Sequence, residues 1–389
     1  PRVRRQRQMC IRDSYNACGV ITMKKQKSMQ WLGILIWGLM GAAAGIAYSH
    51  APTWGKDISL LFELFLSLFV CIYAQVLVHE AGHLVFGLLS GYRFRSFRVG
   101  GVIWIRTDKG VERRRLRLAG TAGQCLMSPP EGDEERISCG WYLMGGALMN
   151  LLSALAALAL YFAFRSQEAL ARFLLTWTIT GTATALVNGI PMNMGLIDND
   201  GRTARAVCAS KEAKRAFLSQ MRVNDFLSEG GRIRDVSAEA LPEENDLSNP
   251  MTAALAVFHA NRLLDAHRFD EARAEIDRLL SADSAIVGVY LQLLACDRMY
   301  LAALDGETER LSELRTPARQ RFFKQMRINP SVLRTGYACA LLADKDSAKA
   351  AAYLARFEDV AKRYPYAGEI EGERELVALA KEKGAQSNG

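Results

Sequence analysis

Long runs of apolar residues fill the first half of the chain, whereas the second half alternates apolar with charged positions. The apolar runs cover residues 31–48, 58–89, 141–164 and 169–190. As helices rising 1.5 Å per residue, they have the length needed to cross about 30 Å of hydrocarbon. The sequence therefore predicts a mainly α-helical protein, with a core of about four transmembrane helices and a soluble helical part after it.

Basic residues indicate the orientation of these helices. The loop of residues 91–140 carries ten Lys and Arg residues, whereas the loops 51–57 and 165–168 carry one each. Cytoplasmic loops are enriched in Lys and Arg, so we expect residues 91–140 and both termini to face the cytoplasm. The formal net charge of +8 then reflects topology, and no nucleic-acid partner is expected. The expected location is a cell membrane crossed several times, of the bacterial inner-membrane type, with the lipid bilayer as a partner.

The basic loop also shows a strand pattern. Residues 92–99 and 102–106 are rich in β-branched and aromatic side chains, Asp108-Lys109-Gly110 is a turn signal, and residues 113–118 continue the pattern. A small β hairpin or sheet is expected. It would either cover anionic lipid or pair an edge strand within 92–106 with an extended substrate. Residues 120–130 are predicted as a re-entrant or interfacial loop.

Four segments are expected along the chain. Residues 1–28 form a basic N-terminal stub that looks artefactual up to about residue 22, and residues 29–205 form the membrane-embedded domain. Residues 206–250 are predicted as a charged linker. Residues 251–389 are predicted as a cytoplasmic helical domain.

The helical domain contains a repeat-like pattern. Residues 260–276 resemble a tetratricopeptide helix pair, with small and aromatic residues at the packing positions, and residues 337–357 echo it. A generic helical bundle is the alternative. In either case, such a domain is expected to bind a partner protein or peptide.

Candidate chemistry begins at His79-Glu80-Ala81-Gly82-His83, an HExxH motif in a chain that has only five histidines. On a helix, residues i and i+4 share one face, so two imidazoles can bind one Zn²⁺ while Glu80 contacts the reacting water. Ionisable groups inside an apolar helix are costly and usually functional. The motif therefore predicts a catalytic zinc site with His79 and His83 as ligands and Glu80 as general base.

A catalytic zinc site needs a third protein ligand, which the two histidines cannot supply. After the last apolar run the chain offers Asp198 and Asp200. The orientation expected from charge puts these residues on the same side as the HExxH motif. Both aspartates are therefore candidates.

Together, these motifs resemble the site-2 protease family of intramembrane zinc metalloproteases. That family combines HExxH with a Gly-x-x-x-Asn helix and a later Asn-x-x-Pro segment that ends in Asp-Gly. Here these features correspond to Gly146–Asn150, Asn188–Pro191 and Asp200-Gly201, although the last two lie farther apart than in the commonest family pattern. The resemblance covers about residues 30–205.

The resemblance implies Asp200 as the third zinc ligand and Asn150 and Asn188 as substrate-binding residues. Gly201 favours Asp200 over Asp198 as well, because glycine permits a tight backbone turn next to the ligand.

The function expected from these features is zinc-dependent endopeptidase activity on membrane-associated proteins or peptide precursors near the cytoplasmic leaflet. One alternative is a non-catalytic membrane scaffold that recruits partners through its helical domain. Glu80 argues against it, because a structural zinc site needs no general base. Another alternative is a soluble-type zinc peptidase with a membrane anchor, and the position of the histidines within an apolar run argues against that.

Overall fold

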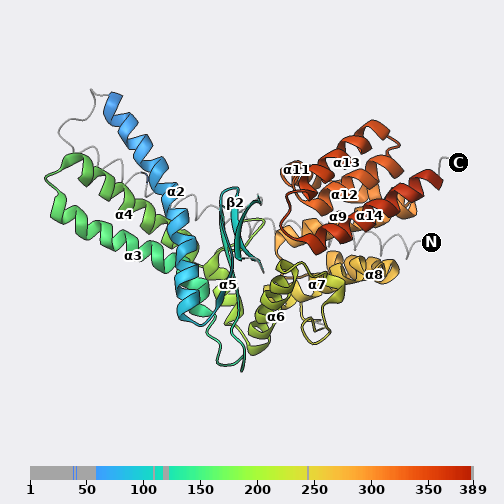
Figure 1. Cartoon of the computed structure of the whole chain (residues 1–389), viewed down its shortest axis with the longest axis horizontal. Coiled ribbons are helices and arrows are strands. Elements are labelled where there is room, and N and C mark those ends of the chain that lie inside the picture. The colour runs from blue at the N-terminus through green and yellow to red at the C-terminus, as the bar shows by residue number, and fades with distance from the viewer. Residues whose placement is uncertain are drawn as a thin grey trace, which may run out of the picture. The chain divides into compact units, whose positions relative to one another are not determined.

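A computed structural model describes residues 38, 41, 58–107, 110–116, 122–242 and 245–386 (Figure 1). The predicted stub and the first apolar run, residues 31–48, lie outside them except for Gly38 and Gly41. The described residues belong to two compact units. The first comprises residues 58–78 and 146–202, and the second comprises residues 79–145 and 203–386.

Three helices within the described residues are long and apolar enough to cross a membrane. They are α2 (Ile58–Leu89), α3 (Gly140–Phe164) and α4 (Glu168–Gly189). These helices match the second, third and fourth predicted runs, and a short turn joins α3 to α4 as expected. The prediction of a mainly helical protein with apolar spans is confirmed for the described part of the chain.

Polar contacts hold the helices of the first unit together. Asn150 of α3 donates from Nδ2 to the backbone oxygen of Gln75 at 2.9 Å and to its side-chain oxygen at 2.6 Å. Arg172 of α4 forms a bidentate ion pair with Glu63 of α2, with nitrogen–oxygen distances of 3.0 and 2.8 Å. A Cβ at Gly181 of α4 would lie 2.9 Å from the Gln75 amide nitrogen, so glycine lets α4 approach.

Helix α4 satisfies most of its hydroxyl groups internally. Five threonines donate to the carbonyl oxygen four residues earlier, at 2.8 or 2.9 Å; they are Thr176, Thr178, Thr180, Thr182 and Thr184. Such bonds are the usual way for a hydroxyl to be accommodated in an apolar helix. The helix can therefore be rich in threonine and still have the character of a membrane span.

The basic loop forms a four-stranded antiparallel sheet of order β3-β2-β1-β4. Its strands are β1 (Arg93–Val99), β2 (Val102–Thr107), β3 (Gly110–Arg115) and β4 (Gly123–Ser128). The predicted small sheet is confirmed. The interfacial loop predicted for residues 120–130 is wrong, because residues 123–128 pair with β1.

The sheet also corrects the expected edge strand. Residues 92–106 lie mainly in β1 and β2, and each of these strands is paired on both sides. Their amides are therefore engaged within the sheet. Within the described residues the edges are β3 and β4, and β4 was missed because Gly-Gln-Cys-Leu-Met-Ser lacks the β-branched residues that mark a strand.

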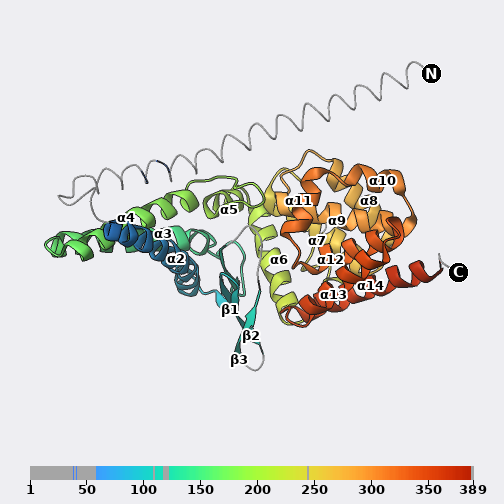
Figure 2. The same cartoon turned by 90° about the horizontal axis from the view of Figure 1, so that it is seen from above.

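The rest of the second unit is helical. Its elements are α5 (Asp200–Val207, from Thr203 onward), α6 (Lys211–Ser228), η1 (Ile233–Asp235), α7 (Pro250–Asp265), α8 (Phe269–Ser281), α9 (Gly288–Asp305), α10 (Thr308–Leu314), α11 (Pro317–Gln325), α12 (Pro330–Ala338), η2 (Cys339–Ala343), α13 (Ser347–Ala361) and α14 (Ala367–Gln386). The range expected as a linker contains α6, which packs against both β4 and α7 (Figure 2).

Local sequence signals explain several helix starts in this unit. Asn249, Thr316 and Asn329 each accept a hydrogen bond from a backbone N–H of the helix that follows, and each precedes a proline at the first helical position. A side-chain cap followed by proline is a strong helix-start signal. Helices α7 and α8 form an adjacent pair within residues 250–281. Their relation to tetratricopeptide repeats stays a prediction.

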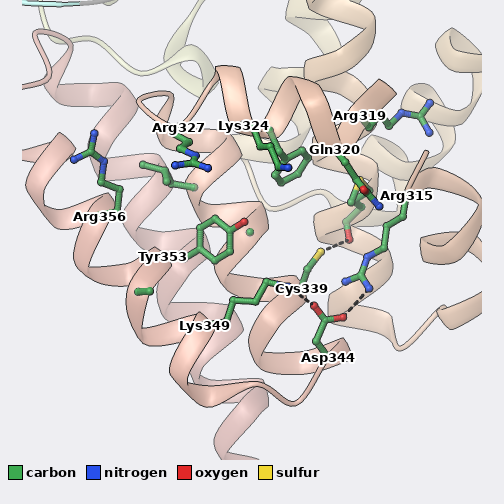
Figure 3. Close-up of a pocket in the computed structure, with 15 residues that line it drawn as sticks. Arg315, Arg319, Gln320, Lys324, Arg327, Cys339, Asp344, Lys349, Tyr353 and Arg356 are labelled. Atoms are coloured by element: carbon green, nitrogen blue, oxygen red, sulfur yellow. Dashed lines mark hydrogen bonds and ion pairs between the residues drawn. The ribbon is translucent and has the colours of Figure 1, made fainter. Parts of the chain in front are cut away.

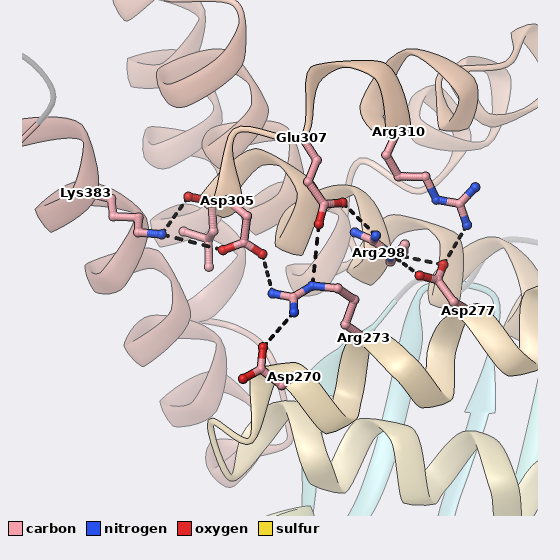
Figure 4. Close-up of polar contacts among 9 residues, drawn as sticks. Asp270, Arg273, Asp277, Arg298, Asp305, Glu307, Arg310 and Lys383 are labelled. Atoms are coloured by element: carbon pink, nitrogen blue, oxygen red, sulfur yellow. Dashed lines mark hydrogen bonds and ion pairs between the residues drawn. The ribbon is translucent and has the colours of Figure 1, made fainter.

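Ion pairs reinforce the helical part. Arg334 is fully buried, and it donates to Asp297 at 2.6 Å and to Glu373 at 2.8 Å while its guanidinium lies over the ring of Tyr300. Figure 4 shows a more exposed network, in which Arg273 contacts Asp270 of its own helix and Asp305 of α9. A buried charge is tolerated when it is paired and hydrogen-bonded in this way.

The contact between α2 and α3 generates a prediction. A Cβ at Gly145 would lie 2.7 Å from the carbonyl oxygen of Gly82, whereas a Cβ at Gly140 of the same helix meets nothing within 4 Å. Gly145→Ala should therefore destabilise the protein by about 1–3 kcal/mol, because the backbone of α2 at Gly82 would have to move away from the new methyl group. Thermal unfolding in detergent measures this, with Gly140→Ala as the matched control. Equal unfolding temperatures for the two variants would contradict the close contact.

Candidate metal centre

The HExxH residues lie on α2, inside one of the apolar spans. Their helical spacing puts His79 and His83 one turn apart on the same face, as predicted. His79, Glu80 and His83 are only 8%, 7% and 9% exposed. Three ionisable side chains are thus withdrawn together into the protein interior, which is costly unless they share a task.

The two imidazoles converge on one point. Their Nε2 atoms lie 3.2 Å apart, and the rings meet edge to face. Two nitrogen ligands of a tetrahedral zinc ion, with bonds of about 2.0–2.1 Å, lie about 3.3 Å apart. The spacing of His79 and His83 therefore fits a shared zinc ion.

A hydrogen bond orients His83. Its Nδ1 lies 2.8 Å from the backbone oxygen of Tyr142 on α3, so Nδ1 donates and Nε2 keeps its lone pair for a metal. Tyr142 is itself held in place, because its hydroxyl donates to the backbone oxygen of Cys125 on β4 at 2.8 Å and its ring stacks on Tyr92. The sheet and α3 together fix the ring of His83.

Asp200 is the acidic residue that could complete the ligand set of the two histidines. One ligand atom from each of His79, His83 and Asp200 lies within 4.8 Å of the others, so these three residues could hold a metal ion. Two imidazoles and one carboxylate form a donor set typical of catalytic zinc, which keeps a further position for water or substrate.

Asp198 has different partners. It accepts a hydrogen bond from Asn193 at 2.9 Å and forms an ion pair with Arg202 at 3.0 Å. Burial raises the pKa of Asp198, and the charge of Arg202 offsets this in part. The Asp198 carboxylate thus belongs to a local network of polar contacts that stabilises the loop of residues 193–202.

Asn199, which the sequence analysis missed, organises the segment between α4 and α5. Its Nδ2 donates at 2.6 Å to the backbone oxygens of Val187 and Ile190, and its Oδ1 accepts from the N–H of Arg202. The last contact is a helix N-cap for α5, so Asn before Asp-Gly-Arg is the signal that could have revealed it. Because α5 begins at Asp200, this cap sets the position of the candidate ligand.

Gly201 serves a purpose other than the one expected. Its backbone φ lies outside the positive region that favours glycine. Instead, a Cβ at this position would overlap the carbonyl oxygen of Gly189. Glycine is required for close approach to the end of α4, and the backbone freedom inferred from the sequence is not used.

Glu80 lies against the sheet. A Cβ at Gly123, the first residue of β4, would overlap the Glu80 carboxylate. Arg98 of β1, which the sequence analysis treated only as a topological charge, is fully buried and donates to the backbone oxygens of Gly100 at 3.0 Å and Gly123 at 2.9 Å. Burial lowers the pKa of Arg98, and the negative charge of Glu80 counteracts this. A buried cation thus supports the strand that borders the candidate base.

The two asparagines expected to bind substrate lie on α3 and α4. Asn150 is fully buried and contacts Gln75, one helical turn before His79. Asn188 is half-buried in the last turn of α4, where its Nδ2 donates to the backbone oxygen of Thr184 at 3.0 Å. Neither residue belongs to the candidate metal group.

An HExxH helix within an apolar span and an aspartate that could complete its ligand set define a membrane metallopeptidase. The model of peptidase family M50 matches residues 67–340, well over half of the chain, so the chain belongs to this family. The family comprises metallopeptidases of the site-2 protease type, in agreement with the resemblance seen in the sequence. No curated protein and no solved structure matches the chain.

The contact between β4 and Glu80 leads to a second prediction. Gly123→Ala should lower peptide hydrolysis at least about tenfold, equivalent to about 1.4 kcal/mol, because the new methyl group displaces the carboxylate. Zinc content should stay at the wild-type level, since neither histidine is touched. Activity assays and metal analysis of the same preparation measure both quantities. Wild-type activity in this variant would show that the strand does not constrain Glu80.

Proposed function

We propose that the protein is an intramembrane zinc endopeptidase that cleaves membrane-associated proteins or peptide precursors near the cytoplasmic leaflet. The observation that carries this proposal is the group formed by His79, His83 and Asp200, with Glu80 beside it on an apolar helix. Family membership supports the same type of chemistry.

Each residue has a distinct role in this proposal. His79, His83 and Asp200 would hold a zinc ion, which would supply the Lewis acidity needed to activate water and the scissile carbonyl group. Glu80 accepts the proton of the attacking water and passes it to the leaving amine. The hydrogen bond to Tyr142 keeps His83 in the tautomer that can bind metal.

We propose that an extended substrate segment lies along β4. This strand is at the edge of the sheet, and its residue Gly123 lies against Glu80. Strand addition supplies backbone hydrogen bonds that hold a peptide extended, whatever its sequence. Asn150 and Asn188 stay proposed substrate-binding residues on the family resemblance, although both side chains donate to backbone oxygens in this structure.

A cell-membrane location with both termini in the cytoplasm completes the proposal. The three apolar helices and the basic loop between α2 and α3 support it. A phosphatase fused after residue 250 reports this topology, because it is active only outside the cytoplasm. The alternative of a non-catalytic scaffold is not favoured, since the general base is present and buried beside the histidines.

Replacing the base should separate catalysis from metal binding. Glu80→Gln is expected to lower hydrolysis by about 100-fold or more while zinc content stays unchanged, because the amide keeps the shape but cannot accept a proton. The matched control is Glu131→Gln, which removes a carboxylate that is 86% exposed. Hydrolysis at the wild-type rate by the Glu80 variant would refute the mechanism.

Metal analysis should distinguish the two aspartates. Asp200→Ala is expected to lose activity and most of the zinc, because one of three protein ligands is gone. Asp198→Ala should keep most of the zinc, since Asp198 contacts Asn193 and Arg202. The two purified variants are compared side by side. Zinc lost from the Asp198 variant alone would reverse the assignment.

A further inference from the structure

A cationic pocket lies in the helical part of the second unit, and it shares no residue with the candidate metal centre. It has a volume of about 930 Å³. Its walls come from α11, α12, η2 and α13 (Figure 3). Sites for small ligands typically measure about 300–1,000 Å³, so this pocket has the size for a ligand as large as a nucleotide.

The pocket carries a large excess of positive charge. Six of its lining residues are basic and one is acidic; they are Arg315, Arg319, Lys324, Arg327, Lys349, Arg356 and Asp344. The single carboxylate, Asp344, is already shared between Arg315 at 2.6 Å and Lys349 at 3.2 Å. The remaining cations are therefore not neutralised from within the pocket.

Lys324 and Arg327 contribute two of these charges. Neither forms an ion pair with a carboxylate among the residues that the structure describes, and Arg356 reaches only Asp359, at 3.5 Å. Figure 3 shows Lys324 and Arg327 above the ring of Tyr353, with Arg356 nearby. The contrast with Figure 4 is clear, because there Arg273, Arg298 and Arg310 all contact carboxylates.

The pocket also offers aromatic surface. Phe323 and Tyr353 line it, and the Tyr353 hydroxyl has no hydrogen-bond partner within the described part of the chain. The ring lies so close to Gly336 of α12 that a Cβ there would overlap it. Glycine thus lets the ring pack against the pocket floor, where it can stack with a planar group.

The floor itself has unusual backbone geometry. Residues Cys339–Ala343 form a π-helical turn at the end of α12, in which the N–H of Asp344 donates to the carbonyl oxygen of Cys339. Such turns are rare and occur frequently at functional sites. Here the turn positions Asp344 at the pocket wall.

We propose that this pocket binds a phosphorylated small molecule of about nucleotide size. A phosphate group at pH 7 carries about −1.5 to −2 charges and three strong acceptor oxygens, which match the donors of Arg and Lys. Lys324, Arg327 and Arg356 bind the phosphate groups. Tyr353 and Phe323 contact the rest of the molecule.

The test measures binding to the full-length protein in nanodiscs of phosphatidylcholine, with ATP, pyrophosphate and glycerol 3-phosphate as probes. An oligoglutamate peptide serves as the comparison for an anion without phosphate. The affected variant is Lys324→Gln/Arg327→Gln. Both side chains are exposed and lack an ion pair within the described chain, so folding should be unaffected. The control is Lys362→Gln/Lys381→Gln, which removes equal charge from exposed positions outside the pocket.

At least one probe should bind with a 1:1 stoichiometry, and the pocket variant should weaken binding at least tenfold while the control does not. Tightest binding of ATP indicates a free nucleotide, and tightest binding of glycerol 3-phosphate indicates a lipid headgroup. The proposal is wrong if no phosphate compound binds or if both variants bind equally. It is also wrong if only an oligoglutamate peptide binds in a pocket-dependent manner.

Discussion

The hydrogen bond from His83 to the backbone oxygen of Tyr142 is the interaction on which the candidate metal centre depends. An imidazole has two nitrogens, and a metal ligand is useful only if the correct one keeps its lone pair. A backbone carbonyl is a suitable partner because it can only accept. The Tyr142 side chain ties the same point to β4 and to Tyr92. Within the second unit, these contacts join α2, α3 and the sheet around the ring of His83.

The parts of this arrangement that follow from periodicity could be predicted from the sequence. The spacing of His79 and His83 places them on one face as long as the segment is helical. The long apolar runs predicted the bounds of α2, α3 and α4 to within a few residues. Strands β1 and β2 were visible through their β-branched and aromatic residues. These features depend on residues that are close in the sequence, so they can be predicted from one sequence.

Features that arise from tertiary contact could not be predicted. Strand β4 has weak strand propensity and forms because β1 offers a partner. Arg98 looked like one of many loop arginines, yet it is buried where it meets Gly123. Gly201 was noticed for its backbone freedom, whereas the structure uses its lack of a side chain. The cationic pocket gathers residues that lie apart in the sequence, and no single one of them stands out among the many Lys and Arg residues of the chain.

The threonines of α4 have a consequence for how such a span is recognised. Hydropathy scales count each hydroxyl as if it faced solvent or lipid, and α4 is accordingly rated as less apolar than α3. In the folded helix these hydroxyls donate to the preceding turn, so neither lipid nor a neighbouring helix has to accept a hydrogen bond from them. A threonine whose hydroxyl is bonded within its own helix therefore resembles valine more closely than it resembles a threonine exposed to water. Composition alone understates how readily α4 partitions into a bilayer.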